Sequence, residues 1–481
     1  MEELGRRVAQ KAAKGILGKV KSVLGVGEAE IEVGLIRARA PSVEKAKELL
    51  DYGVETLLKL PQTGGVLGRA DERELEDPEV RKKKIRGAED AQRLIEAPKV
   101  AALPEKERLR FSIFALITYG DERFHSRAFA EAERTYRRAY EFSQELGDKA
   151  LRAICLNLVG AALGMQGKAE PALRYFERAL RLKSDFGETW YNKGITLHKL
   201  GRFEEAVACW DRAIDIGPNL AEAWHNKAVA LHELHRFDEA ITYYDKAIGM
   251  NPGYAEALHN KGVALHDLNR FEEAAACYSE SIEVNPDYAD AWYDKGVALF
   301  ELNRFEEAVA CWDKAVQINP GFGEAWYNKG VTLHRLDRFG EAIACWNKTV
   351  RINPRFAQAW YNKGITLHEL GRLGAAIACW DRAIQIDNDF AEAWYNKGFV
   401  LHKMGRFEDE VPCWDEVTRI NPGDSKAWYN KGLALCKVGQ LERAVACLDK
   451  AVEMNPDYAE AWCDRGVVLH ELGKVEEAIA C

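Results

Sequence analysis

The sequence lacks the features of membrane-spanning and secreted chains. No apolar run approaches the roughly 20 residues that a helix needs to cross a bilayer. The first residues, MEELGRRVAQKAAKG, are too charged to lead into the apolar core of a signal peptide. We therefore predict a cytoplasmic protein with no integral membrane segment.

The short motifs of common catalytic and metal sites are also missing. None of the eleven cysteines forms a Cys-x-x-Cys pair. The sequence has no glycine-rich phosphate loop and no HExxH or GxSxG motif. These absences disfavour disulfide and zinc frameworks, and they predict a protein that is not an enzyme and has no cofactor or metal.

The composition that remains is typical of globular or repeat proteins. Of the 481 residues, 47% are hydrophobic and 30% are charged, which disfavours disordered and collagenous classes. A chain of this length is expected to form about three domains or one elongated array. Residues 1–112 carry a net charge of +3 and residues 113–481 a net charge of −12, so the acidic part disfavours general nucleic-acid binding.

A repeat of 34 residues runs through most of the chain. Tryptophan recurs at this interval, with Leu258 in its place once, and a glycine follows four residues later, with Ala228 in its place once. A proline closes most units, and Asn388 replaces it in one of them. The recurring residues are Trp190, Trp224, Trp292, Trp326, Trp360, Trp394, Trp428 and Trp462; Gly194, Gly262, Gly296, Gly330, Gly364, Gly398, Gly432 and Gly466; and Pro218, Pro252, Pro286, Pro320, Pro354, Pro422 and Pro456.

One unit shows why this pattern predicts a pair of helices. Trp326, Gly330 and Leu333 are spaced by four and three residues, which places them on one face of a helix over 324–335. A second apolar stripe predicts a helix over 338–352, ended by the Asn-Pro step because proline has no amide hydrogen. Gly330 allows the two helices to approach closely, and two such helices must stack on further pairs to bury their stripes.

These residues resemble the tetratricopeptide repeat, which shares the tryptophan, the glycine, the Phe-x-x-Ala of FEEA, a second aromatic residue and the closing proline. The resemblance implies an all-α, right-handed superhelical solenoid of helix-turn-helix repeats with a concave groove. It covers two divergent repeats in 113–186, eight repeats in 187–458 and a partial repeat in 459–481, about three quarters of the chain.

Residues 1–112 form a different segment, for which we expect helices and a linker. The first 24 residues have a basic amphipathic pattern. We predict a second helix over 42–60, a charged linker over 64–86 and a short helix over 88–96. The basic helix could lie on an acidic membrane surface or dock on a partner. We favour a third role, in which it caps the first repeat, because the ends of a solenoid need a polar cover.

An asparagine recurs two residues after the tryptophan position. In the tetratricopeptide family the first helix of each unit lines the groove, and several members use an asparagine at this place to hold a peptide backbone. A carboxamide has both donors and an acceptor, so it can bond to any backbone. The alternative is that these residues only tie adjacent helices together. The predicted groove asparagines are Asn192, Asn226, Asn260, Asn328, Asn362, Asn396 and Asn430, with Asp294 and Asp464 interrupting the series.

Tyrosine and histidine recur beside the asparagines and predict an amphipathic floor for the groove. Neighbouring units place equivalent atoms roughly 10 Å apart, too far for one zinc ion with ligands at about 2 Å. We expect instead a groove whose positive charge rises below about pH 6.5. The tyrosines are Tyr191, Tyr293, Tyr327, Tyr361, Tyr395 and Tyr429, with His225 and His259 at the same place; the histidines of the second series are His198, His232, His266, His334, His368, His402 and His470.

Two further residue types recur once in most units. A lysine follows each asparagine, and we expect its stem to cover the packed face while its ammonium group reaches solvent or a neighbouring carboxylate. A cysteine recurs in the second helix, where we expect a small buried apolar residue. These cysteines are Cys209, Cys277, Cys311, Cys345, Cys379, Cys413, Cys447 and Cys481.

The predicted function is a non-catalytic scaffold or sensor that binds an extended peptide or protein segment in the concave groove. Two alternatives stay open. In the first, the protein is a signalling or defence component with 1–112 as adaptor or effector and the repeats as sensor. In the second, it is an architectural protein that self-associates through an uncapped C-terminal end, because the sequence stops at Cys481 inside a second helix.

Overall fold

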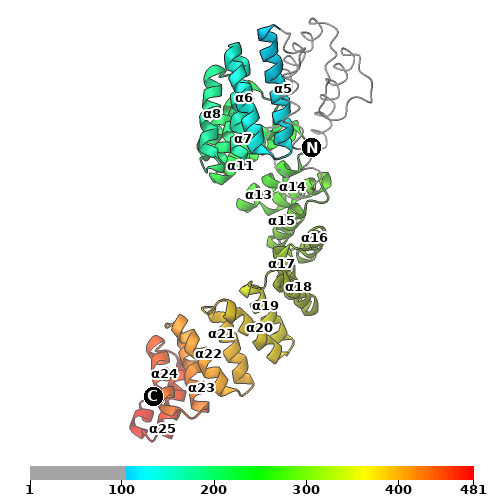
Figure 1. The fold of residues 1–481 in the computed structure, drawn as a ribbon. Helices are drawn as coiled ribbons and strands as arrows, with labels where there is room; N and C mark the ends of the chain where they lie inside the picture. Colours follow the sequence, from blue (N-terminus) through cyan, green and yellow to red (C-terminus); the bar gives the residue numbers. More distant parts are fainter. Residues whose placement is uncertain (1–103) are drawn as a thin grey trace, which may run out of the picture. The chain divides into compact units, whose positions relative to one another are not determined.

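The computed structural model describes residues 104–481, and all regular structure in this part of the chain is α-helical (Figure 1). This finding confirms the predicted all-α class. The predicted basic helix in 1–24, the helix over 42–60, the linker over 64–86 and the short helix over 88–96 lie outside the described residues.

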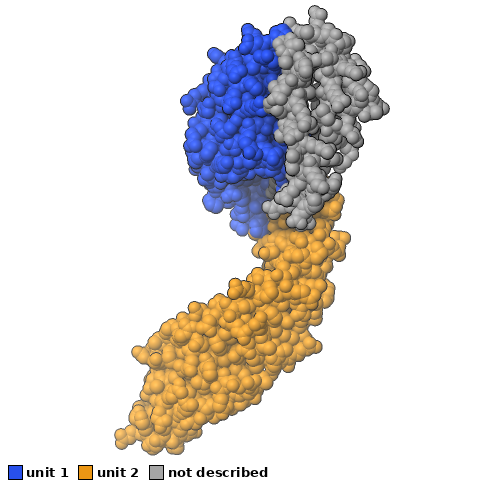
Figure 2. All heavy atoms as spheres, in the orientation of Figure 1, with its two compact units in different colours: residues 1–269 blue, residues 270–481 orange. Residues whose placement is uncertain are grey.

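The chain divides into two compact units, residues 1–269 and 270–481 (Figure 2). In the described part of the first unit, helices follow one another as antiparallel pairs that pack on the next pair. The first of them begins before residue 113, where the first divergent repeat was expected to start. The helices are α5 (Glu105–His125), α6 (Phe129–Leu146), α7 (Lys149–Met165), α8 (Ala169–Leu182), α9 (Gly187–Lys199), α10 (Phe203–Ile216), α11 (Ala221–Glu233), α12 (Phe237–Met250) and α13 (Ala255–Asp267).

The second unit has the same organisation, with the first helix of each pair packed between second helices. The helices predicted over 324–335 and 338–352 begin at Gly323 and Phe339, within one residue of the predicted positions. The helices are α14 (Phe271–Val284), α15 (Ala289–Glu301), α16 (Phe305–Ile318), α17 (Gly323–Arg335), α18 (Phe339–Ile352), α19 (Ala357–Glu369), α20 (Leu373–Ile386), α21 (Ala391–Lys403), α22 (Phe407–Ile420), α23 (Ser425–Lys437), α24 (Leu441–Met454), α25 (Ala459–Glu471) and α26 (Val475–Ile479).

The recurring glycine of the first helix faces the aromatic ring of the second helix. A Cβ atom at Gly330 would lie 2.6 Å from Nε1 of the buried Trp346, and one at Gly364 would lie 2.4 Å from the same atom of Trp380. No side chain fits in that space, so the ring packs directly on the helix backbone. The predicted close approach at Gly330 is therefore confirmed.

The recurring tryptophan of the first helix fixes the end of the preceding helix. Nε1 of Trp360 donates a hydrogen bond to the carbonyl oxygen of Pro354 at 3.2 Å, and Trp428 bonds to Pro422 at 2.8 Å in the same way. The Asn-Pro step thus ends one helix and also supplies an acceptor that positions the next one.

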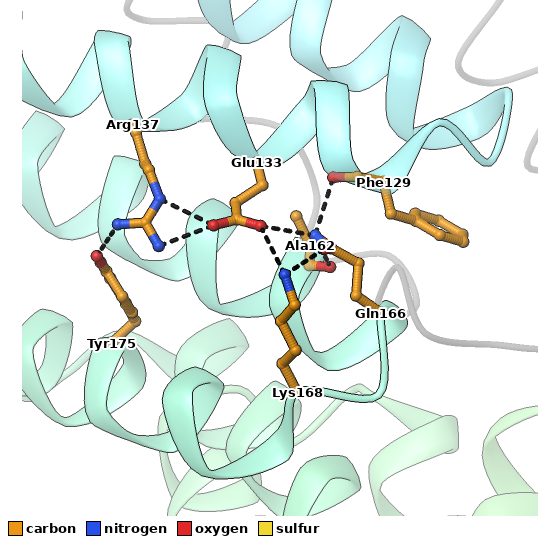
Figure 3. Close-up of polar contacts among 7 residues, drawn as sticks. All are labelled: Phe129, Glu133, Arg137, Ala162, Gln166, Lys168 and Tyr175. Carbon is orange, nitrogen blue, oxygen red and sulfur yellow. Dashed lines mark hydrogen bonds and ion pairs between the residues drawn. The ribbon is translucent and has the colours of Figure 1, made fainter.

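A polar network joins the two divergent pairs of the first unit (Figure 3). The Glu133 carboxylate of α6 accepts hydrogen bonds from Arg137 at 2.8 and 2.9 Å and from Gln166 at 2.8 Å, and the Lys168 ammonium lies 3.8 Å away. Arg137 also donates to the hydroxyl of Tyr175 in α8. Burial favours a higher pKa for Glu133, but the bonds from Gln166 and Arg137 lower its pKa below the usual range.

Candidate functional site

The predicted groove asparagines form hydrogen bonds between successive repeats. Within each unit, the first helices of neighbouring pairs lie side by side, so an asparagine meets the tyrosine 35 residues earlier. Nδ2 of the asparagine donates to the tyrosine hydroxyl, and we call this bond the Asn–Tyr latch. Among residues 104–481, four such bonds have donor–acceptor distances of 2.9–3.0 Å: Asn226 to Tyr191, Asn328 to Tyr293, Asn362 to Tyr327 and Asn396 to Tyr361.

An aromatic ring supports the tyrosine of each latch in the second unit. The ring of Tyr327 lies 4.8 Å from that of Phe356, which directly precedes the next first helix, and Tyr361 packs on Phe390 at the same distance. Burial raises the pKa of Tyr327, which keeps its hydroxyl protonated. The latch therefore combines a hydrogen bond with aromatic packing, and the alternative role of the asparagines in tying helices together is present in the structure.

The latch does not use the whole carboxamide. An asparagine side chain offers two N–H donors and an acceptor oxygen, and the bond to tyrosine takes one donor. Asn328, Asn362 and Asn396 are only half-buried, although Oδ1 of Asn362 lies 3.4 Å from the Gln358 amide. These side chains keep bonding capacity on the face that they share with the tyrosines, which we call the first-helix face.

The first unit departs from this arrangement at two places. Asn192 is fully buried, and its Nδ2 donates at 3.2 Å to Asn157, which in turn bonds to Glu188. The prediction of Asn192 as an accessible groove residue is thus wrong for this structure, because neighbouring polar side chains enclose it. Asn260 bonds at 3.0 Å to Nε2 of His225, which stands at the tyrosine place.

The second unit departs from the latch at its C-terminal end. Asp464 stands at the asparagine place and accepts a 2.7 Å hydrogen bond from the Tyr429 hydroxyl. A carboxylate therefore joins the two first helices there in place of a carboxamide. By contrast, the Tyr395 ring packs edge-on against Trp414 with a centroid distance of 4.9 Å. Within the described residues, neither the Tyr395 hydroxyl nor the Asn430 side chain has a hydrogen bond, so this step between repeats is unlatched.

Most predicted groove histidines pack against the second helix of their own pair. The His198 ring lies 5.2 Å from Phe203 and His334 lies 5.3 Å from Phe339, and burial lowers the pKa of His198. Their polar contacts differ from repeat to repeat: His232 with Asp267 at 2.7 Å, His334 with Thr366 at 2.9 Å and His402 with Glu410 at 3.1 Å. His266 and His368 are likewise half-buried, whereas His470 is exposed.

Most lysines of the row pair with carboxylates of the preceding second helix, but Lys363 does not, because Asn347 stands at the carboxylate place. Lys397 lies 2.6 Å from Asp381, and its ammonium also sits 5.2 Å from the centre of the Trp394 ring. The prediction that the ammonium groups reach solvent or a neighbouring carboxylate is confirmed for the paired lysines. Equivalent pairs are Lys227 with Asp211, Lys261 with Asp245, Lys329 with Asp313 and Lys431 with Asp415.

The recurring cysteines are buried packing residues, as predicted, except for Cys481. Burial raises the pKa of Cys209, Cys311 and Cys345 to about 11, so their thiols stay protonated near neutral pH. Cys481 is exposed because it follows the short last helix, α26. Across residues 104–481, no three His, Cys, Asp or Glu side chains group into a candidate metal site, and no helix of that range is long and apolar enough to cross a membrane.

Sequence reasoning missed three residues of the unlatched step. Glu410 is almost fully buried where other repeats place alanine, Asp424 replaces the aromatic residue that supports a latch, and Phe399 is 43% exposed. A comparison of the units place by place reveals each of these substitutions. They were not predicted as site residues because the prediction rested on residues that recur in every repeat, and these three differ from their counterparts.

Family models described as tetratricopeptide or TPR repeats match most of the described chain, in segments that lie between residues 115 and 473. The matched segments are 115–185, 185–252, 219–287, 259–321, 323–356, 345–378, 366–405, 391–424, 413–446 and 432–473. The search of curated proteins found no match.

Several solved structures of repeat proteins are similar to parts of the chain. YrrB, described as a TPR protein with an unusual peptide-binding site, is 26% identical, and the match covers 39% of this chain and 96% of YrrB with a TM-score of 0.36. MamA from Desulfovibrio magneticus RS-1 is 24% identical, with 33% and 89% covered and a TM-score of 0.31. A tetratricopeptide repeat protein from Parabacteroides merdae is 16% identical, with 53% and 100% covered and a TM-score of 0.37.

Proposed function

Because the chain belongs to the tetratricopeptide repeat family, a family of protein-interaction scaffolds, we propose that it binds an extended segment of another protein along the first-helix face. In this proposal the protein is not an enzyme. Apart from Cys481, its recurring cysteines are buried, and burial raises the pKa of thiols such as Cys345, which suits packing rather than nucleophilic chemistry.

The observation that carries the proposal is the unused bonding capacity of the latch asparagines. In the second unit, Asn328, Asn362 and Asn396 are partly exposed and recur once per repeat on neighbouring first helices. Packed helices lie about 10 Å apart, and an extended chain advances about 3.3 Å per residue. One amide therefore meets about every third residue of a bound backbone, whatever side chains that backbone carries.

The test must separate ligand binding from the structural role of the latch. The full chain is applied to a random peptide array beside a variant with Asn328, Asn362 and Asn396 changed to Ala. A control variant carries Tyr293, Tyr327 and Tyr361 changed to Phe, which removes the same latch bonds but keeps the carboxamides.

We expect the asparagine variant to lose peptide binding by about tenfold or more and the tyrosine variant to keep most of it. Each lost backbone bond is worth about 0.5–1.5 kcal/mol, and about 1.4 kcal/mol corresponds to tenfold in affinity. Binding that survives the asparagine changes contradicts the proposal. Equal losses in the two variants also contradict it, because the asparagines would then act only through the latch.

The other functional predictions stay predictions. An adaptor or effector role for residues 1–112 predicts that their deletion abolishes output and spares ligand capture. Assembly through the C-terminal end predicts particle mass that rises with concentration in light scattering. Cytoplasmic location is likewise a prediction, which imaging of the tagged full chain in its host tests.

A further inference from the structure

The repeat over 391–424 departs from its neighbours at places that the other repeats keep. Glu410 and Thr418 replace the recurring alanine and the recurring β-branched apolar residue of the second helix. Pro412 lies inside α22, where it removes one backbone donor, and Asp424 replaces an aromatic residue. Four substitutions of recurring residues in one repeat of a regular array indicate that this repeat has a role of its own.

With these departures, the Asn–Tyr hydrogen bond is absent between α21 and α23 in the described structure. Glu410 accepts the Trp414 Nε1 bond at 2.7 Å, whereas Trp312 and Trp380 donate that bond to a backbone carbonyl of the first helix. The Tyr395 ring meets the Trp414 ring edge-on, an arrangement that the latched tyrosines Tyr327 and Tyr361 lack.

Asp424 also replaces the aromatic ring that packs on the tyrosine at a latched step. Its carboxylate caps α23 by accepting bonds of 2.9 and 3.1 Å from the backbone amides of Lys426 and Ala427. It therefore provides no ring beneath Tyr395, in contrast to Phe356 and Phe390 at the latched steps. The Tyr395 hydroxyl and the Asn430 carboxamide are left without mutual bonding.

An exposed aromatic ring and unpaired positive charges lie on the same face of these helices. Phe399 follows Tyr395 by one helical turn and is 43% exposed, with the Lys403 ammonium 4.5 Å from its ring centre. Lys426 precedes Asn430 by one turn. Neither lysine has an ion pair within residues 104–481.

The excess of positive charge at the step is absent from the two repeats directly beside it. At the place of Lys426, the other helix of the step, α21, carries Glu392, and the following first helix α25 carries Glu460. At the place of Lys403, the other helix of the step, α23, carries Lys437, whereas the preceding α19 and the following α25 carry Glu369 and Glu471. At these two places the unlatched step therefore carries three lysines and one carboxylate, whereas the first helices on either side carry carboxylates and no cation. A ligand with carboxylates is attracted to this step and repelled by the repeats on either side.

We propose that this unlatched step, formed by Tyr395, Phe399, Lys403, Lys426 and Asn430, selects the ligand of the first-helix face: an extended acidic peptide with an apolar or aromatic side chain between its carboxylates. The inference rests on the proposed function and adds the place and the chemistry of selection. Asn430 and the Tyr395 hydroxyl bond the peptide backbone, Phe399 packs on the apolar side chain, and the lysines pair with its carboxylates.

The experiment compares the full chain with two variants on designed peptides. The probes are synthetic peptides in which Leu or Phe alternates with Asp and Glu, and matched peptides in which Lys replaces the acids. The first variant combines Lys403→Glu and Lys426→Glu, and the second carries Phe399→Val. Each change installs a residue type that another repeat has at that place, for example Glu369, Glu460 and Val331, so the fold should tolerate it.

A matched control changes the same two places at a latched step, with Arg335→Glu and Gln358→Glu. We expect acidic apolar peptides to bind the wild-type chain, with affinity reduced about tenfold or more by the lysine variant and about threefold or more by Phe399→Val. The control should stay within about twofold of wild type. Circular dichroism of each variant verifies its helical fold.

The outcomes separate this inference from the proposed function. If acidic apolar peptides bind and the lysine variant binds them equally well, the inference fails and the proposed function stands. The same holds if the chain prefers the lysine peptides, or if the control variant loses as much affinity as the lysine variant. If the chain binds no peptide on the designed set or on the random array, both fail.

Discussion

Nε1 of Trp414 donates its hydrogen bond to the carboxylate of Glu410, four residues earlier in α22 and only 1% exposed. His402 of the paired first helix lies 3.1 Å from the same carboxylate. In the repeats on either side, this place holds Ala376 and Ala444, both fully buried. One repeat therefore encloses an ionisable group at the contact where its neighbours have a methyl group.

Replacing Glu410 with Ala should stabilise the protein at neutral pH. Burial raises the pKa of Glu410 above its usual value, so the folded state disfavours the ionised form. The destabilisation is therefore present when pH exceeds the folded pKa, and it fades as pH falls towards the unfolded value. Apolar replacement of a buried ionic group is often neutral or stabilising by about 1–4 kcal/mol, and the buried Ala376 and Ala444 show that alanine packs at this place.

Thermal unfolding of the full chain checks this prediction at about pH 7.5 and about pH 4. The midpoint of Glu410→Ala should exceed that of wild type at the higher pH, and the difference should shrink at the lower pH. Glu408→Ala on the exposed side of the same helix serves as the control and should change little. A midpoint lowered at neutral pH would show that the bonds to Trp414 and His402 outweigh the burial of charge.

Breaking one latch should destabilise the contact between two repeats. Tyr327→Phe removes the acceptor of the Asn362 bond and should cost about 0.5–1.5 kcal/mol, measured as faster hydrogen exchange in α17 and α19. Tyr395→Phe is the matched control, because its hydroxyl has no hydrogen bond among the described residues. Equal effects of the two substitutions would mean that the latch contributes no stability.

The helix pairs could be predicted from sequence because the local pattern determines them. The spacing of Trp326, Gly330 and Leu333 and the Asn-Pro step give α17 and α18 to within one residue. The latch could not be predicted in this way. It joins residues 35 positions apart, and its geometry depends on the rotation of one first helix against the next, which the periodicity of a single unit leaves open.

The burial of Asn192 illustrates the same limit. It belongs to the recurring series, yet Asn157, in a divergent repeat, accepts its hydrogen bond and helps to enclose it. The substitutions Glu410 and Asp424 were visible in the sequence, but their effect on Tyr395 depends on how the Tyr395 and Trp414 rings pack between α21 and α22. Sequence pattern thus defines which residues recur, and packing defines which of them remain available to a ligand.

A methyl group at Gly330 should disrupt its helix pair. The added Cβ would lie 2.6 Å from Nε1 of Trp346, so the ring or the backbone must shift, at a cost of about 1–3 kcal/mol. Gly340→Ala in the next helix is the control, because a Cβ there meets nothing within 4 Å and should stabilise by up to about 1 kcal/mol. Chemical denaturation should move the two midpoints in opposite directions. A shift in the same direction would contradict the close-packing role of Gly330.

The cysteines should differ sharply in their reactivity towards alkylating reagents. The thiolate is the reactive form, and burial raises the pKa of Cys155 and Cys413 to about 12 and that of Cys345 to about 11. Cys463 and Cys481 are exposed, so they should react first.

Iodoacetamide labelling of the native chain, followed by peptide mapping, checks this order, and labelling in denaturant should modify all eleven thiols. Cys436 should react at an intermediate rate, because it is half-buried and burial raises its pKa to about 11. Cys345 and Cys413 should become reactive only when their helix pairs open, so their labelling rates also report local stability. If Cys413 reacted faster than Cys345, the repeat with buried Glu410 would open more readily than its neighbour. If both reacted as fast as Cys463, the pairs would not enclose their second helices as the structure describes.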